Sequence, residues 1–257
     1  IPVTSLNKFF NRFFLVNFLI LSIGIPLLFS SYTRSVFEVN KLLLLRLIIL
    51  VVYGAWIVKS CLLKDNNLLA NEEDSYCVFG FRWRRIGLEI PMLVWIIINL
   101  LSILFSENIF IAYIGAYDRW EGIATISNYI MLFYMVAKLL DDFKYRLLII
   151  MISLFSTSIS SIYGIIQSLG VDFMNWSTSP TSRVFACINN PVHFCAYVAM
   201  LVPIGISLTY YFISRLNSDK KNTSTKTPFA FLVSFPITIF LSYFFTFDSL
   251  ISLEFLQ

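Results

Sequence analysis

The sequence is poor in charge, in histidine and in paired cysteines, and these shortages limit what the protein can be. Only 13% of its 257 residues are charged and 58% are hydrophobic, whereas in soluble domains about a quarter are charged. His193 is the one histidine, and the four cysteines form neither a CxxC pair nor a zinc-binding spacing. A soluble globular domain is therefore excluded, and neither a metal nor a cofactor is expected.

The motifs of common soluble enzymes are also missing. The sequence has no P-loop, no G-x-S-x-G, no H-E-x-x-H and no GxGxxG. The middle of the apolar runs has no acidic residue, which argues against an ion-coupled pump. The net charge of +4 calls for no nucleic-acid partner, because lysine and arginine accumulate in the cytoplasmic loops of membrane proteins.

Long apolar runs recur along the chain, and each could cross a bilayer as a helix. They predict an all-α, polytopic transmembrane bundle that forms a single domain over 1–257, in contact with membrane lipids. Seven spans are expected, at about 13–32, 42–58, 86–105, 122–140, 147–169, 191–213 and 229–247.

Lysine and arginine are more frequent in every second loop, and the bias is the same loop by loop. It predicts a cytoplasmic N-terminus and an outer C-terminus. Arg119, Arg183 and His193 then lie at the outer face. The long loop 59–85 lies in the cytoplasm and is expected to be a solvated connector.

A polar loop leads into the sixth predicted span and forms the first candidate site. Asn190 suits the N-cap of a helix, and Pro191 suits its first position. Such a helix start carries free N–H groups and a partial positive charge, which favour a phosphate. Arg183 precedes it. His193, in the first turn, is either a hydrogen-bonded residue of the interface or a group that donates to a phosphate or exchanges protons.

The loop 113–122, between the third and fourth predicted spans, is the second candidate. Its aromatic residues fit the interfacial belt of a membrane protein. Arg119 either pairs with Asp118 or Glu121 and sets the depth of the helix, or it faces a cavity and binds a diphosphate or an anionic headgroup through its planar set of donors.

Small hydroxyl residues crowd the fifth predicted span. At this density they usually let helices pack closely in lipid, and a transport pathway is the alternative. They are Ser153, Ser156, Thr157, Ser158, Ser160 and Ser161.

Several segments, in the same order, resemble the O-antigen ligase and polymerase family. Those of the first half are Phe37–Lys41, 99–106, Gly115, Arg119, Glu121-Gly122 and Thr125. Those of the second half are Tyr163-Gly164, 167–170, Arg183, Asn189-Asn190-Pro191, Ala196-Tyr197 and Pro203. They cover most of 37–213.

The resemblance implies a multi-pass glycosyltransferase of the bacterial inner membrane that acts in lipopolysaccharide or surface-polysaccharide biosynthesis. Members of the family transfer glycans from an undecaprenyl-diphosphate carrier at the periplasmic face. By this resemblance Arg119 and Arg183 stabilise the leaving diphosphate, Asn190 shapes the helix start, and Glu121 orients Arg119.

The C-terminal spans and the large periplasmic loop of the family are missing, and the segment 246–249 lacks the arginine of the family's pattern. We therefore expect a partial member that is inactive on its own. Two other hypotheses remain open, namely a transporter or flippase-like carrier and a non-catalytic remnant.

Overall fold

The chain divides into two compact units. Unit 1 consists of Ile1–Leu21 and Glu38–Leu147, and unit 2 of Ser22–Phe37 and Leu148–Gln257. The computed structural model describes residues 3–62 without 31 and 34, the strand residues 75–78 and 81–84, residues 87–140 without 118, and residues 142–219 without 175, 177–180 and 182. The seventh predicted span and the segment 246–249 lie outside these residues. Each unit is described by itself.

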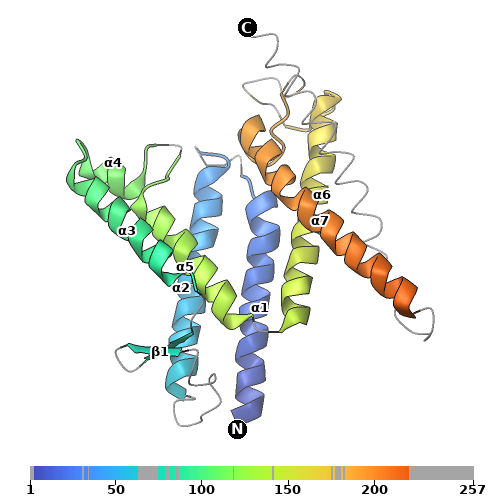
Figure 1. Ribbon diagram of the computed structural model, residues 1–257. Coiled ribbons are helices and arrows are strands. Elements are labelled where there is room, and N and C mark those ends of the chain that lie inside the picture. Colours follow the sequence, from blue (N-terminus) through green and yellow to red (C-terminus); the bar gives the residue numbers. More distant parts are fainter. Residues whose placement is uncertain are drawn as a thin grey trace. The chain divides into compact units, whose positions relative to one another are not determined.

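Helices dominate the described residues (Figure 1). Their bounds are α1 Val3–Leu27, α2 Glu38–Leu62, α3 Glu89–Leu104, α4 Ile109–Ile114, α5 Ile123–Leu139, α6 Phe143–Ser168 and α7 Pro191–Asp219. The strands β1 (Ser75–Val78) and β2 (Phe81–Arg84) pair antiparallel with Tyr76 opposite Trp83.

Four of the helices in the described residues are long and apolar enough to cross a bilayer, which indicates a membrane protein. They cover Ser5–Leu27, Glu38–Leu62, Phe143–Ser168 and Pro191–Tyr211. Helices α3 and α5 occupy two more of the predicted spans but have only 16 and 17 residues, somewhat fewer than the roughly 20 of a typical span. The helical character of six predicted spans is confirmed, and a sufficient length is confirmed for four of them.

Two elements were missed by the sequence prediction. Helix α4 has only six residues, too few to show a helical period. Its N-cap is Asn108, whose side chain accepts hydrogen bonds from the backbone N–H groups of Phe110 and Ile111 at 3.1 and 3.2 Å. The hairpin lies in the loop that was expected to be a plain connector. Its strand sequences, SYCV and FRWR, are rich in the aromatic residues that favour strands.

One end of unit 1 gathers lysines around aromatic rings. The ammonium group of Lys59, in the last turn of α2, donates a hydrogen bond of 2.8 Å to Asn11 Oδ1 of α1. Lys138, at the end of α5, places its ammonium group 4.2 Å from the centroid of the Trp56 ring, close enough for a cation–π interaction. The start of α1 and the ends of α2 and α5 therefore meet here. We call this the lysine-rich end of unit 1.

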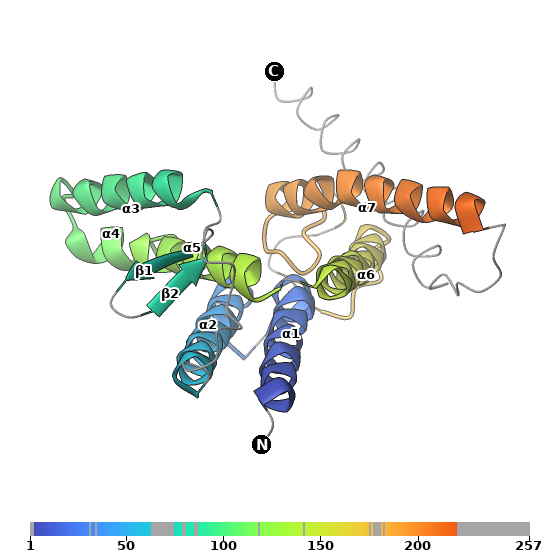
Figure 2. The ribbon, with the colours of Figure 1, turned by 60° about the horizontal axis from the view of Figure 1, so that its bottom comes forward.

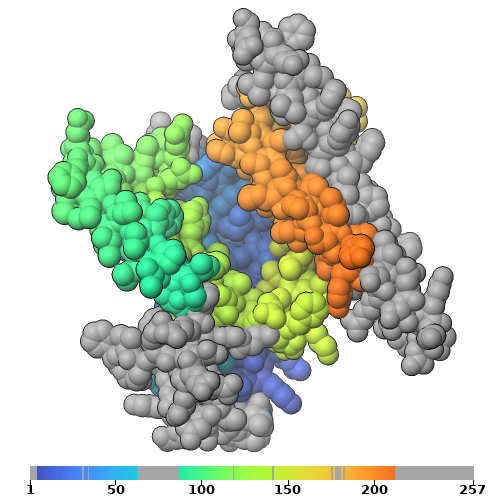
Figure 3. All heavy atoms as spheres, viewed as in Figure 1, coloured from blue at the N-terminus to red at the C-terminus, as the bar shows by residue number. Residues whose placement is uncertain are grey.

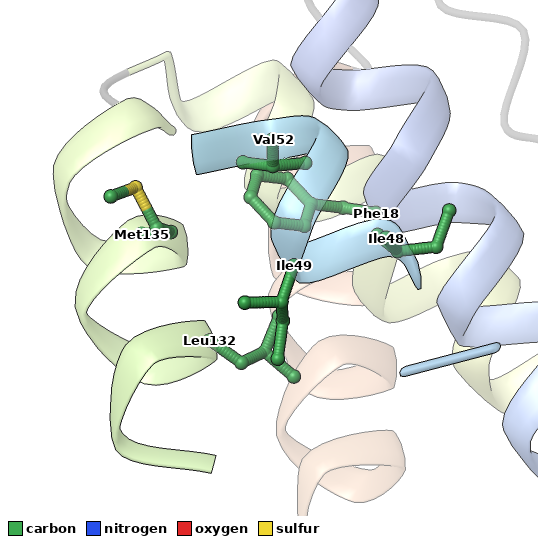
Figure 4. A pocket seen from close by; sticks show the side chains of 6 residues that line it. All are labelled: Phe18, Ile48, Ile49, Val52, Leu132 and Met135. Carbon is green, nitrogen blue, oxygen red and sulfur yellow. The ribbon is translucent and has the colours of Figure 1, made fainter. Parts of the chain in front are cut away.

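The middle of unit 1 is apolar. A small pocket between α1, α2 and α5 is lined by apolar side chains alone (Figure 4): Phe18, Ile48, Ile49, Val52, Leu132 and Met135. Val52 and Met135 are each only 1% exposed. This contact holds the three helices together without any polar group in the pocket lining.

Helix α3 has no buried residue. It contacts α4 and α5, and both ribbon views place it along the outside of them (Figures 1 and 2). In the space-filling view it forms an open surface of unit 1 (Figure 3). Its one asparagine, Asn99, satisfies its own side chain by donating to the carbonyl of Trp95 at 2.7 Å. An apolar surface of this kind is suited to lipid.

Hydroxyl side chains join the helices of unit 2. Ser156 Oγ of α6 donates to the backbone carbonyl of Ser22 in α1 at 2.8 Å. Thr157 Oγ1 lies 2.7 Å from the hydroxyl of Tyr197 in α7. Both side chains are completely buried, and Ser158, Ser160 and Ser161 are buried as well. The prediction that these small residues let helices pack closely is confirmed.

Two substitutions among these hydroxyl residues should lower the free energy of unfolding by different amounts. Thr157→Val keeps the shape but removes the hydrogen bonds to Tyr197 and to the carbonyl of Ser153, so it should lower the free energy of unfolding by about 1 kcal/mol. Ser160→Ala removes a buried hydroxyl that has no partner among the described residues and should cost less. Thermal unfolding in detergent measures both, and an equal loss would contradict the expectation.

Candidate functional site

The connection between α4 and α5 folds back on itself. The backbone N–H of Gly122 donates to the carbonyl of Ile114 at 3.3 Å. A Cβ atom on Gly115 would lie 2.5 Å from the carbonyl carbon of Trp120, and one on Gly122 would collide with the carbonyl of Tyr113. Gly115 also has φ +103°, which side chains rarely tolerate. Only glycine therefore fits at these two positions. We call residues 115–122 the glycine-closed loop.

A buried threonine holds the end of this loop. Thr125, in the first turn of α5, is 1% exposed, and its hydroxyl donates to the carbonyl of Trp120 at 2.6 Å. The same hydroxyl lies 3.5 Å from Nη2 of Arg46 in α2. The first half of α2 therefore meets the start of α5, whereas the ends of both helices meet at the lysine-rich end. Helices α2 and α5 run parallel, and the glycine-closed loop lies at the opposite end of unit 1 from Lys59 and Lys138.

Arg119 and Glu121 are both exposed on the glycine-closed loop. The backbone N–H groups of Arg119 and Trp120 both donate to the carbonyl of Ala116, at 3.1 and 2.9 Å. These bonds form a tight turn that fixes the backbone but leaves the side chain of Arg119 in the open. No ion pair joins Arg119 to Glu121, and Asp118 lies outside the described residues. The role of Glu121 in orienting Arg119 stays a prediction.

The start of α7 has the predicted geometry. The helix begins at Pro191. The side-chain oxygen of Asn190 accepts a hydrogen bond from the N–H of Val192 at 2.9 Å, and its carbonyl accepts one from the N–H of Phe194 at 2.9 Å. Asn190 is therefore the N-cap of α7, as predicted. The cap occupies the Val192 amide, so His193 supplies the main-chain N–H of the first turn that remains for a ligand.

Arg183, Asn190 and His193 are all exposed, and all belong to unit 2, at or just before the start of α7. Arg119 and Glu121 belong to unit 1. The candidate site residues thus form two exposed groups, one in each unit. Each group combines an arginine with the beginning of an apolar helix.

A buried amide supports the loop that carries Arg183. Gln167, fully buried in α6, accepts a hydrogen bond of 2.8 Å from the backbone N–H of Ala186. Ala186 and Phe194 are buried in one core cluster with Tyr163. Gly164 lets this loop approach α6 closely, because a Cβ there would be 3.0 Å from Cγ1 of Val184. The loop is therefore anchored between Arg183 and Asn190, and again just after Asn190 at Phe194.

The sequence prediction assigned no role to Asp172. Its carboxylate accepts hydrogen bonds from the hydroxyl of Tyr163 at 3.0 and 3.2 Å, from Nε1 of Trp176 at 2.6 Å and from the backbone N–H of Met174 at 3.1 Å. Burial alone would raise the pKa of Asp172, but these bonds outweigh it and hold the pKa below its usual value. The sequence feature that could have revealed this role is an acidic residue within an aromatic segment.

Aromatic rings surround this carboxylate. Phe29 stacks on Tyr163 at a centroid distance of 5.9 Å, Phe37 stacks on Trp176 at 5.5 Å, and Phe185 meets Trp176 edge to face at 5.2 Å. The cluster joins the loop after α1, the end of α6 and the loop before α7. Asp172 and its rings are therefore a structural clamp beside the candidate site.

Within the part of the chain that the structure describes, no three His, Cys, Asp or Glu side chains come together as a metal site requires. Comparisons with protein-family models, with curated proteins and with solved structures found no match for this chain. The resemblance to the O-antigen ligase and polymerase family therefore rests on the residues of the chain itself.

The glycine-closed loop makes a clear prediction. Gly115→Ala and Gly122→Ala should each destabilise unit 1 by several kcal/mol, because a Cβ would collide with the backbone of the same loop. Gly54→Ala in α2 is the matched control, since nothing lies within 4 Å of a Cβ there. Thermal unfolding in detergent measures the stability of the three variants. Equal stability of all three would contradict the loop geometry.

Asp172 predicts a dependence on pH. Because its pKa is lowered in the folded state, its contribution to stability is present above about pH 3.9, its usual pKa, and is lost as the pH falls through the folded value. Asp172→Asn should cost about 1.5 kcal/mol at neutral pH, a usual contribution of hydrogen bonds to a charged group. The difference from the wild type should shrink in acid. Unfolding curves from pH 7 to pH 3 measure it, and a constant difference would contradict the assignment.

Proposed function

We propose that this protein is an O-antigen ligase-like membrane protein that binds polyprenyl-diphosphate-linked glycans at the outer face of a bacterial inner membrane and takes part in their transfer. The observation that carries the proposal is the start of α7. There an N-capped helix of candidate-span length begins eight residues after the exposed Arg183, with the exposed His193 in its first turn. The resemblance of 37–213 to the family supplies the identity of the ligand.

The chemistry of the exposed groups suits a diphosphate. A guanidinium offers a planar set of charge-assisted donors to phosphate oxygens. The α7 start adds the main-chain N–H of His193 and the partial positive charge of a helix N-terminus. The glycine-closed loop adds Arg119, which no ion pair with Glu121 occupies. Each group lies near the start of an apolar helix of its own unit, which suits a ligand that carries its diphosphate on a lipid chain.

The proposed transfer needs charge stabilisation above all. A hydroxyl oxygen of the acceptor glycan or lipid attacks the anomeric carbon, and the bond from that carbon to the diphosphate oxygen breaks. Negative charge grows on the leaving polyprenyl diphosphate, which finally takes the proton that the hydroxyl loses. Arg119 and Arg183 stabilise this charge as it develops.

A transporter or flippase-like carrier is less well supported. Such a protein needs polar groups along a path through the membrane. The pocket between α1, α2 and α5 is instead lined by six apolar side chains, and the exposed arginines lie in loops. A non-catalytic remnant would bind the lipid-linked glycan without transferring it, so binding and transfer are measured separately.

The test uses the full chain in lipid nanodiscs and a fluorescent polyprenyl-diphosphate-linked disaccharide. Arg119→Gln and Arg183→Gln should each weaken binding about tenfold or more, the effect of removing a charge-assisted hydrogen bond. Arg12→Gln is the matched control, because Arg12 is exposed but lies beside Asn11 at the lysine-rich end. Release of free polyprenyl diphosphate in the presence of an acceptor glycan measures transfer.

The double variant asks whether both arginines serve one diphosphate. If they do, the effects of the two substitutions should be coupled rather than additive. Binding by both single variants that equals binding by Arg12→Gln would refute the proposed site. Binding of the probe without any release of polyprenyl diphosphate would reduce the proposal to a binding protein.

A further inference from the structure

Arg46 is a charged residue inside a candidate membrane span. It lies eight residues after the first residue of α2, or about 12 Å along the helix axis, and apolar residues flank it on both sides in Glu38–Leu62. The neighbouring Leu45, Ile48 and Ile49 are buried, so Arg46 borders the buried face of the helix. Charged residues at such positions are costly and usually functional.

The protein offers Arg46 little compensation. A guanidinium has five N–H donors, but the one hydrogen bond that Arg46 makes with a described residue is the long contact of 3.5 Å to Thr125 Oγ1. That hydroxyl already donates its hydrogen to the carbonyl of Trp120, so it can only accept from Arg46. Among the described residues no carboxylate pairs with Arg46.

The surroundings of Arg46 favour an anion. Thr125 is the third residue of α5, so the guanidinium faces a helix end that carries a partial positive charge itself. A cation is unfavourable there unless an anion lies close to both. The indole N–H of Trp120, the residue whose carbonyl accepts from Thr125, is buried and also has no acceptor among the described residues.

We propose that Arg46, with the adjoining end of the glycine-closed loop, binds the phosphate of a membrane lipid from within the bilayer. Donors without acceptors and a cation without a described counter-ion together favour an acceptor that carries negative charge. A lipid phosphate reaches this depth on its own apolar chain. The identity of that lipid, a polyprenyl diphosphate, rests on the proposed function. In this arrangement Arg46 binds the oxygens of the diphosphate that face the membrane interior.

The test measures binding of three probes to the full chain in phosphatidylcholine nanodiscs: farnesyl diphosphate, inorganic diphosphate and added phosphatidylglycerol. Arg46→Gln should weaken binding of farnesyl diphosphate about tenfold or more, and Arg46→Lys, which keeps the charge, should restore most of it. Lys59→Gln removes a cation from the lysine-rich end of the same helix and should bind as the wild type does. Thermal unfolding of each variant identifies any loss of fold.

The outcomes separate this inference from the proposed function. Wild-type affinity for farnesyl diphosphate in Arg46→Gln would overturn the role of Arg46 and leave the proposed function standing. Binding of phosphatidylglycerol that depends on Arg46, without binding of farnesyl diphosphate, would support the lipid-phosphate site and refute the proposed function. If inorganic diphosphate bound as tightly as farnesyl diphosphate, a soluble anion would suffice, and the proposal that the ligand is a lipid would be overturned. Equal losses of affinity and of thermal stability in both Arg46 variants would assign Arg46 to helix packing alone.

Discussion

Hydrogen bonds from side chains to loop backbone hold the connections between the apolar helices in place. Thr125 donates to the carbonyl of Trp120, Gln167 accepts from the N–H of Ala186, and Asn190 accepts from the N–H of Val192. Close to a membrane, a backbone polar group without a hydrogen-bond partner is destabilising, because little water is present to replace the partner. These three side chains fix the shape of the loops, and the exposed groups depend on that shape.

The consequence is a contrast between fixed backbone and open side chains. In the glycine-closed loop the backbone crosses itself at Gly115 and Gly122, and Arg119 remains exposed on it. Before α7 the loop is anchored by Gln167 and Phe194, and Arg183 remains exposed on it. Because the backbone of the loop is already fixed, the binding of an anion costs less conformational entropy. Both loops therefore carry an exposed arginine on a fixed backbone, which is what the proposed binding of a diphosphate requires.

The sequence predicted well those features that depend on residues close together in the chain. Asn190 followed by Pro191 correctly placed the start of α7, since an N-cap acts within one turn. The hydroxyl residues of α6 correctly predicted close helix packing. In contrast, the partners of Asp172 lie nine positions before it and two and four positions after it, across a turn, and no periodic pattern reveals such a cluster. Helix α4 was missed because six residues are too few to show a period.

The sequence by itself determined that this is a helical membrane protein with polar groups at its helix ends, because length, hydropathy and capping depend on neighbouring residues. Tertiary structure alone decided which of those groups are satisfied and which are exposed. Arg46 shows the difference. In the sequence it is one cation among several near a loop, and only the packing of α2 against α5 leaves it beside a hydroxyl that cannot neutralise it. The physical reason is that a counter-charge comes from residues distant in the chain, whose approach is set by packing rather than by local preference.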